Sequence, residues 1–208
     1  MTLDQGPDER PRLRRLIRAL LGERLTAAIN ESRNFHRTVR SPDRTIMKEK
    51  ILPAFAGLGG HLLWIGCRRY TADYPLLLEQ QGAVCWTIDI DPEAAKWGRK
   101  GRHVIGDIGE APERLEGVVF DGILCNGILG FGVDTTEAQH RCLSAISRML
   151  KPGGTLLLSW NTDRTDDPFK AGVVDDASLA AVPFAGLAAR VAVPGTTHVY
   201  DFLRKLPP

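Results

Sequence analysis

The sequence has few of the features that mark disulfide-rich, metal-binding or membrane-spanning proteins. Its four cysteines form no C-x-x-C pair and its five histidines show no metal-ligand spacing, so we predict reduced thiols and no metal site. The longest apolar run, residues 122–133, is short and is broken by Asn126 and by glycines, which argues against a membrane span. The N-terminus carries charges where a signal peptide has its apolar segment, and we therefore expect a cytoplasmic protein.

An excess of charge of one sign is also missing. Lys and Arg number 27 and Asp and Glu 25, a net charge of +2, so no overall field directs the chain toward nucleic acid or a membrane. The 208 residues, 43% of them hydrophobic, suffice for one domain with its own core and a small appendage. The arginines between Arg10 and Arg18 are interpreted as a solvated helix face, with a patch for RNA or an acidic partner as the alternative.

The N-terminal part is predicted to be helical. Apolar residues recur at steps of three and four between Leu13 and Ala28, which predicts an amphipathic helix. A second helix is expected from about Asp43 to the glycines at 57–60. Because both precede the first predicted strand, residues 1–60 are expected to form a helical appendage that acts as a lid, and residues 61–208 the main domain.

From His61 onward, short apolar segments alternate with amphipathic ones. Strands are predicted at 61–66, 83–90, 103–108, 118–126 and 155–160, and helices at 73–81, from Asp91, at 110–117 and at 135–150. This alternation predicts a parallel sheet with helices on both faces. Segments 188–195 and 198–205 are too close for a crossover and must form an antiparallel hairpin. The fold class is therefore α/β, a doubly wound sheet of seven strands or nearly so, mostly parallel with an antiparallel C-terminal strand.

The longest predicted helix has clear limits. Asp134, with Glu137 three residues later, predicts its start in a capping-box arrangement, and the run from Lys151 to Gly154 predicts its end. The helix over 135–150 should therefore connect the fourth strand to the fifth.

Four predicted strands end in residues suited to a nucleoside ligand. They end at Gly66, Asp89, Asp107 and Asn126, and the carboxyl ends of parallel strands meet at one edge of the sheet, where ligands bind. A glycine lets a ligand approach the backbone closely, and a carboxylate at the end of the second strand can accept both hydroxyls of a ribose. One ligand site is therefore predicted at this edge.

Together these segments resemble the class I S-adenosylmethionine-dependent methyltransferases, as a divergent member. The resemblance is carried by LLWIGC, WTIDIDPEAAKWG, HVIGDI, FDGILCNGIL and LSAISRMLKPGGTLLLSW. It implies a Rossmann-like fold and S-adenosyl-L-methionine as the cofactor, with Asp89 on the ribose and Asp107 on the adenine amino group. The predicted cofactor-binding residues are Gly66, Cys67, Arg68, Asp89, Ile90, Asp107, Ile108, Asn126 and Gly127.

The loop after the first strand departs from this family. Trp64 stands where the family usually has an acidic residue, and the loop from Gly66 to Thr71, GCRRYT, lacks two of the family's glycines. Arg68 or Arg69 is a candidate partner for the carboxylate of the cofactor, with both arginines in solvent as the alternative. Tyr70 is a candidate for facing the sulfonium.

The sequence supplies several candidates for the chemistry of the reaction. Tyr70, Asn126 and, within the appendage, His36 are the predicted catalytic residues. Further candidates near the predicted site are Tyr74, Asp134, Asn161 and Asp163. The loops at 130–134 and 161–170 and the N-terminal helices are expected to build the acceptor site.

The predicted function is that of an S-adenosylmethionine-dependent methyltransferase acting on a small molecule in a biosynthetic pathway, without nucleic-acid or membrane partners. The main alternative is a non-methylating lyase or cyclase that releases methylthioadenosine, for example one forming aminocyclopropane or azetidine carboxylate. A binding-only protein and an RNA methyltransferase are the other hypotheses. The sequence leaves the oligomeric state open, a homodimer included.

Overall fold

A computed structural model describes residues 38 and 40–207 of the chain. The chain divides into two compact units, Met1–Ser41 and Pro42–Pro208, and the second of them contains the whole sheet. The helix predicted between Leu13 and Ala28, the arginines beside it and His36 lie outside the described residues. None of the described helices is long and apolar enough to cross a membrane.

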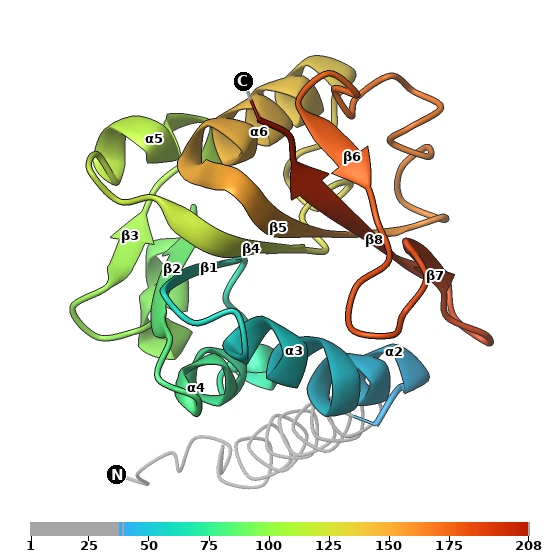
Figure 1. Cartoon of the computed structure of the whole chain (residues 1–208). Coiled ribbons are helices and arrows are strands. Elements are labelled where there is room, and N and C mark those ends of the chain that lie inside the picture. Colours follow the sequence, from blue (N-terminus) through green and yellow to red (C-terminus); the bar gives the residue numbers. More distant parts are fainter. Residues whose placement is uncertain (1–37, 39, 208) are drawn as a thin grey trace, which may run out of the picture. The chain divides into compact units, whose positions relative to one another are not determined.

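One mixed sheet runs through the second unit in the order β3-β2-β1-β4-β5-β8-β6, with β7 also paired to β8 (Figure 1). β1 to β5 are parallel, and β8 is antiparallel to β5, β6 and β7. This confirms the predicted fold class and the predicted terminal hairpin. The strands are β1 His61–Ile65, β2 Val84–Asp89, β3 His103–Ile105, β4 Phe120–Asn126, β5 Leu150–Asn161, β6 Leu179–Ala181, β7 Arg190–Ala192 and β8 His198–Lys205.

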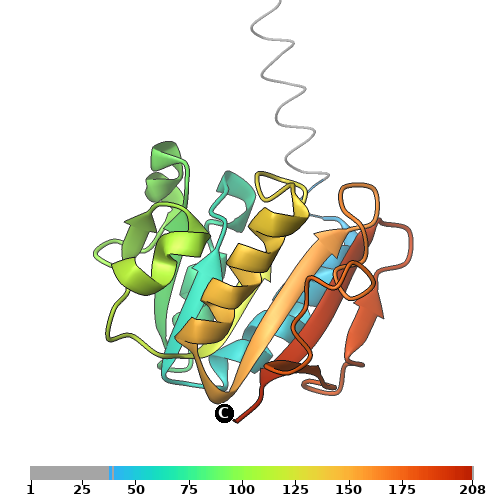
Figure 2. The ribbon, with the colours of Figure 1, turned by 90° about the horizontal axis from the view of Figure 1, so that it is seen from above.

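Helices cover both faces of the sheet (Figures 1 and 2). On one face lie α2 Pro42–Ile46, the π-helical turn η1 Met47–Ile51, α3 Leu52–Ala56 and α4 Tyr74–Glu79. On the other lie α5 Ala111–Arg114 and α6 Thr136–Met149. The short 3-10 helices are η2 Arg69–Thr71, η3 Pro92–Trp97 and η4 Ile108–Glu110. A separate hydrophobic core fills each side, as burial of both faces of a parallel sheet requires.

Two local predictions need correction. The cap of α6 is Thr135, whose Oγ1 accepts a hydrogen bond from the Ala138 amide at 3.2 Å; Asp134 instead accepts one from the Gly132 amide at 3.0 Å. Two residues able to cap stand side by side, and Thr135 is the one whose extended backbone places its side chain over the first turn. The segment after Asp91 is a 3-10 helix rather than an α-helix.

The register of the sheet brings polar side chains together at the carboxyl ends of β4 and β5. Asn126 is paired with Ser159, Ser159 with Tyr200, and Asn161 with His198. Paired residues, and residues two apart on a strand, share a face. Because Tyr200 belongs to the core on the side of α2 to α4, all five residues lie on that face.

Candidate functional site

A cleft lies at the carboxyl ends of β1, β2 and β4 and consists of two adjoining cavities. Their volumes are about 120 Å³ and 130 Å³, and both are lined by Gly66, Arg68, Ile128 and Phe131. We call the first the apolar half; its other lining residues include Ile88, Asp89, Ile90, Asp107, Ile108 and Val133. We call the second the polar half; it is completed by Arg44, Tyr70, Thr71, Asn126, Gly127, Asn161 and His198.

The apolar half combines large apolar side chains with two carboxylates, those of Asp89 and Asp107. Ile90 follows β2 and is 67% exposed, although it is a large apolar side chain, and the buried Ile108 lies deeper in the cleft. Asp107 begins η4, where its Oδ1 accepts a hydrogen bond from the Gly109 amide at 2.6 Å. The other carboxylate oxygen of Asp107 is left to accept hydrogen bonds at the rim.

Asp89, the last residue of β2, is almost fully buried and already has three hydrogen bonds. Its Oδ2 accepts from the Cys67 amide and from Arg68 Nη1, both at 2.7 Å, and its Oδ1 accepts from the Asp91 amide at 2.9 Å. A carboxylate offers about four acceptor positions, so one on Oδ1 remains for a ligand hydroxyl. Arg68 therefore partners Asp89, an arrangement that sequence reasoning did not foresee.

Gly66 directly follows β1, at a point where only glycine fits well. Its φ is +86°, and a Cβ built there would lie 3.2 Å from Cγ2 of Ile128. Its carbonyl oxygen accepts a hydrogen bond from Trp64 Nε1 at 2.7 Å. Trp64 is fully buried and packs edge-on against Tyr74. The residue in the usual acidic position thus supports the core and fixes the loop, while the missing side chain of Gly66 opens the cleft.

The polar half contains a buried guanidinium that sequence analysis did not single out. Arg44, from α2, has a side chain only 11% exposed, and its Nε lies 3.2 Å from Oδ2 of Asp43. This contact is not aligned as a hydrogen bond, and Nε and Nη1 have no hydrogen-bond partner among the described residues. The guanidinium lies over the Tyr70 ring, 4.8 Å from its centroid, so one face of Tyr70 is already covered.

Asn126 and His198 form the side of the polar half nearest β5 and β8. Asn126 Oδ1 accepts a hydrogen bond from Ser159 Oγ at 2.9 Å, which leaves the amide nitrogen as the donor available to the cleft. His198 is 4% exposed, and its Nε2 has no hydrogen-bond partner within the described part of the chain. Burial, assisted by Arg44 and opposed by Asp43, lowers the pKa of His198 to about 4. The ring is therefore neutral at neutral pH.

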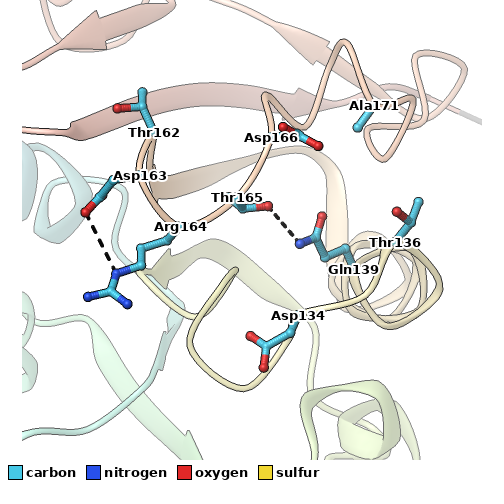
Figure 3. A pocket seen from close by; sticks show the side chains of 9 residues that line it. All are labelled: Asp134, Thr136, Gln139, Thr162, Asp163, Arg164, Thr165, Asp166 and Ala171. Atoms are coloured by element: carbon cyan, nitrogen blue, oxygen red, sulfur yellow. Dashed lines mark hydrogen bonds and ion pairs between the residues drawn. The ribbon is translucent and has the colours of Figure 1, made fainter.

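A second, larger pocket of about 390 Å³ lies between the loop after β5 and the start of α6 (Figure 3). Gln139 Nε2 donates to Thr165 Oγ1 at 2.9 Å across its floor, and Arg164 lies 3.9 Å from Asp163. The guanidinium of Arg164 also covers the ring of Phe131, which lines both halves of the cleft. The loops expected near the acceptor do meet here. The described carboxylates form no group that could hold a metal ion.

The structure gathers most, though not all, of the predicted site residues. Gly66, Arg68, Asp89, Ile90, Asp107 and Ile108 line the apolar half, and Tyr70, Asn126, Gly127 and Asn161 line the polar half. Cys67 lines neither; burial, with a further contribution from Asp89, raises the pKa of its thiol to about 12. Tyr74 is a core residue, and Asp134 and Asp163 line the second pocket.

Comparisons with known proteins bear on the family and the fold. Residues 63–158 match a family model described as a methyltransferase domain. The N-methyltransferase NodS from Bradyrhizobium japonicum has a similar structure, with a TM-score of 0.64, 15% identity, and coverage of 81% of this chain and 99% of that one. No curated protein sequence matches the chain significantly.

Two other solved structures have the same fold. A TehB-like S-adenosylmethionine-dependent methyltransferase from Corynebacterium glutamicum has a TM-score of 0.60 at 18% identity, covering 86% of this chain and 97% of that one. An rRNA methylase from Streptococcus thermophilus has a TM-score of 0.54 at 11% identity, covering 81% and 99%. At these identities the likeness establishes the fold.

Proposed function

The chain carries a class I, S-adenosylmethionine-dependent methyltransferase domain, and from this premise we propose that it methylates a small molecule bound in the polar half of the cleft. The observation that carries the proposal is the division of one cleft into an apolar half beside Asp89 and a small polar half beside Asn126 and His198. Each half suits a different ligand.

The residues of the apolar half fit the adenosine part of the cofactor. Asp89 has an acceptor position for a ribose hydroxyl, Ile90 and Ile108 offer apolar contact to adenine, and Asp107 offers an acceptor at its edge. Gly66 supplies the space that a Cβ would fill. When bound, S-adenosylmethionine supplies a methyl group activated by its sulfonium. The protein then has to orient the acceptor and exclude water.

The polar half fits a compact acceptor. It is small, about 130 Å³, and its lining side chains offer hydrogen-bonding groups to a compact ligand. Asn126 offers a donor that holds the acceptor, and the neutral His198 has an unpaired ring nitrogen that can form a hydrogen bond with it. Tyr70 lies against the guanidinium of Arg44 in the same lining.

We also propose that α2 covers the polar half. α2 places Arg44 in the lining of the polar half, and the Tyr200 hydroxyl donates to the Asp43 carbonyl at 2.9 Å, which ties α2 to β8. Closure from this side would exclude water from the acceptor.

Three incubations with S-adenosylmethionine test the proposed function: protein alone, protein with a small-metabolite extract, and protein with total RNA. Mass spectrometry follows S-adenosylhomocysteine and methylthioadenosine. We expect S-adenosylhomocysteine to form with the extract and not with RNA, and Asp163→Asn, in the second pocket, to behave as wild type. Methylthioadenosine from protein alone would establish the lyase or cyclase alternative, and turnover with RNA alone would overturn the small-molecule acceptor.

A further inference from the structure

Arg44 has more hydrogen-bonding capacity than the protein uses. Its side chain is about nine-tenths buried, yet Nε and Nη1 have no hydrogen-bond partner among the described residues. Leaving a buried charged donor unsatisfied is costly. Asp43 offsets part of the charge at 3.2 Å without an aligned hydrogen bond. An arginine held in this state at the wall of a cleft is suited to a ligand that completes its hydrogen bonds.

The surroundings of Arg44 specify the charge of that ligand. Among the described residues, no carboxylate lines the polar half, whereas two guanidinium groups do; that of Arg68 is hydrogen-bonded to Asp89, and that of Arg44 has the Asp43 carboxylate at 3.2 Å without an aligned hydrogen bond. Asn126 contributes a further donor, and His198 is uncharged. Donors without a facing acceptor attract an anion. Tyr70 lies against the guanidinium, and the planar fork of N–H donors that an arginine presents matches a carboxylate.

We propose that Arg44 binds a carboxylate group in the polar half of the cleft. The group comes either from the aminobutyrate arm of the cofactor or from the acceptor, and the inference rests on the proposed function. Arg44, Asn161 and His198 all lie outside residues 63–158, the part matched by the family model. The site therefore combines residues of the matched region, such as Asn126, with residues of the segments on either side of it.

Calorimetry with three nucleosides tests the cofactor as the source. The probes are S-adenosylhomocysteine, its decarboxylated analogue, and methylthioadenosine, which lacks the whole amino-acid arm. If the cofactor supplies the carboxylate, wild type binds S-adenosylhomocysteine about tenfold more tightly than the decarboxylated analogue. Arg44→Gln removes that difference and leaves the affinity for methylthioadenosine unchanged.

Lys48→Gln is the matched control. Lys48 lies one turn away on η1, is paired with Asp73 at 2.7 Å and does not line the cleft, so this variant keeps the tenfold difference. Arg44→Lys keeps the charge without the planar fork and retains part of the difference. A thermal melt of each variant establishes that it is folded; if Arg44→Gln is not, Arg44→Lys and a titration with acetate carry the test.

Acetate tests the acceptor as the source. The Nε–H resonance of Arg44 is identified as the one that disappears in Arg44→Lys. If the acceptor supplies the carboxylate, acetate shifts this resonance in wild type that is saturated with S-adenosylhomocysteine. If neither the nucleoside difference nor the resonance depends on Arg44, the carboxylate site is overturned and Arg44 is structural. If none of the nucleosides binds to wild type, the proposed function itself fails, and that result is distinct because methylthioadenosine does not involve Arg44.

Discussion

The guanidinium of Arg68 donates a hydrogen bond at 2.7 Å to Oδ2 of Asp89, the carboxylate expected to hold the ribose of the cofactor. The side chain of Asp89 is 3% exposed, whereas that of Arg68 is 45% exposed. Arg68 therefore covers Asp89 from the solvent side and occupies an acceptor position that a ribose hydroxyl would otherwise use.

Removing Arg68 should strengthen the binding of a nucleoside that has no carboxylate. We expect Arg68→Ala to bind adenosine about fivefold more tightly, because a hydroxyl then gains a charge-assisted hydrogen bond to Oδ2. Asp89→Asn, which removes the negative charge of the side chain, should weaken the binding of adenosine by about tenfold. Isothermal titration measures both. Weaker adenosine binding by Arg68→Ala would mean that Arg68 supports the nucleoside instead of competing with it.

Gly66→Ala should damage the cleft more than an equally strained substitution elsewhere. Gly101 has a φ of +77° with nothing within 4 Å of an added Cβ, whereas the Cβ at Gly66 meets Ile128. Each substitution should cost about 1 kcal/mol of the free energy of unfolding for its left-handed backbone, but only Gly66→Ala should also weaken S-adenosylhomocysteine binding. Urea unfolding and calorimetry give the two quantities. If Gly66→Ala and Gly101→Ala bind S-adenosylhomocysteine with equal affinity, Gly66 is not part of the binding site.

His198 should make the protein less stable in mild acid. Its pKa is about 4 in the folded state against 6.5 ordinarily, so between these values the unfolded state binds the extra proton. The free energy of unfolding therefore falls as the pH decreases from about 6.5 to 4, by at most about 3 kcal/mol. The groups facing His198 are Asp43, Arg44 and Tyr200.

Urea unfolding at pH 7, 5.5 and 4.5 measures this slope, and His198→Gln should flatten it. Burial also lowers the pKa of His103, so a smaller slope of the same sign should persist in the variant. A variant profile as steep as that of wild type would exclude His198 as the cause.

Arg190 should anchor the loop that forms the second pocket. Its guanidinium binds Asp167 in that loop and the buried Asp201 on β8, with shortest contacts of 2.6 Å to each. Arg190→Met should cost about 2 kcal/mol of the free energy of unfolding, because Asp201 keeps only the hydrogen bond from Trp160. Arg148→Met breaks an exposed pair and should cost less than about 1 kcal/mol. If thermal or urea unfolding shows that the two variants lose the same free energy of unfolding, Arg190 does not anchor the loop.

The sequence was sufficient for Asp89 and Asp107 in the apolar half of the cleft because each comes at or just after the end of a predictable strand. Asp89 and Asp107 follow apolar runs, and parallel strands bring their carboxyl ends to one edge whatever the details of packing. The terminal hairpin was predictable for the same reason, since a short connection permits only antiparallel pairing.

The polar half was not predictable to the same extent. His198 faces the cleft only because β8 pairs with β5 in a register that sets it opposite Asn161, and no local pattern encodes that register. Arg44 is one of many arginines in the sequence and is distinguished only by the packing of α2. β6 also escaped prediction, because three residues paired with a single neighbouring strand are too few to show an alternating pattern.

Three residues that line the polar half lie outside β1 to β4: Arg44 precedes β1, and Asn161 and His198 follow β4 in the chain. Substitutions of these three residues therefore change this part of the lining and leave Gly66, Asp89 and Asp107 untouched. The same division suggests an engineering route in which libraries are confined to 42–56 and 161–200.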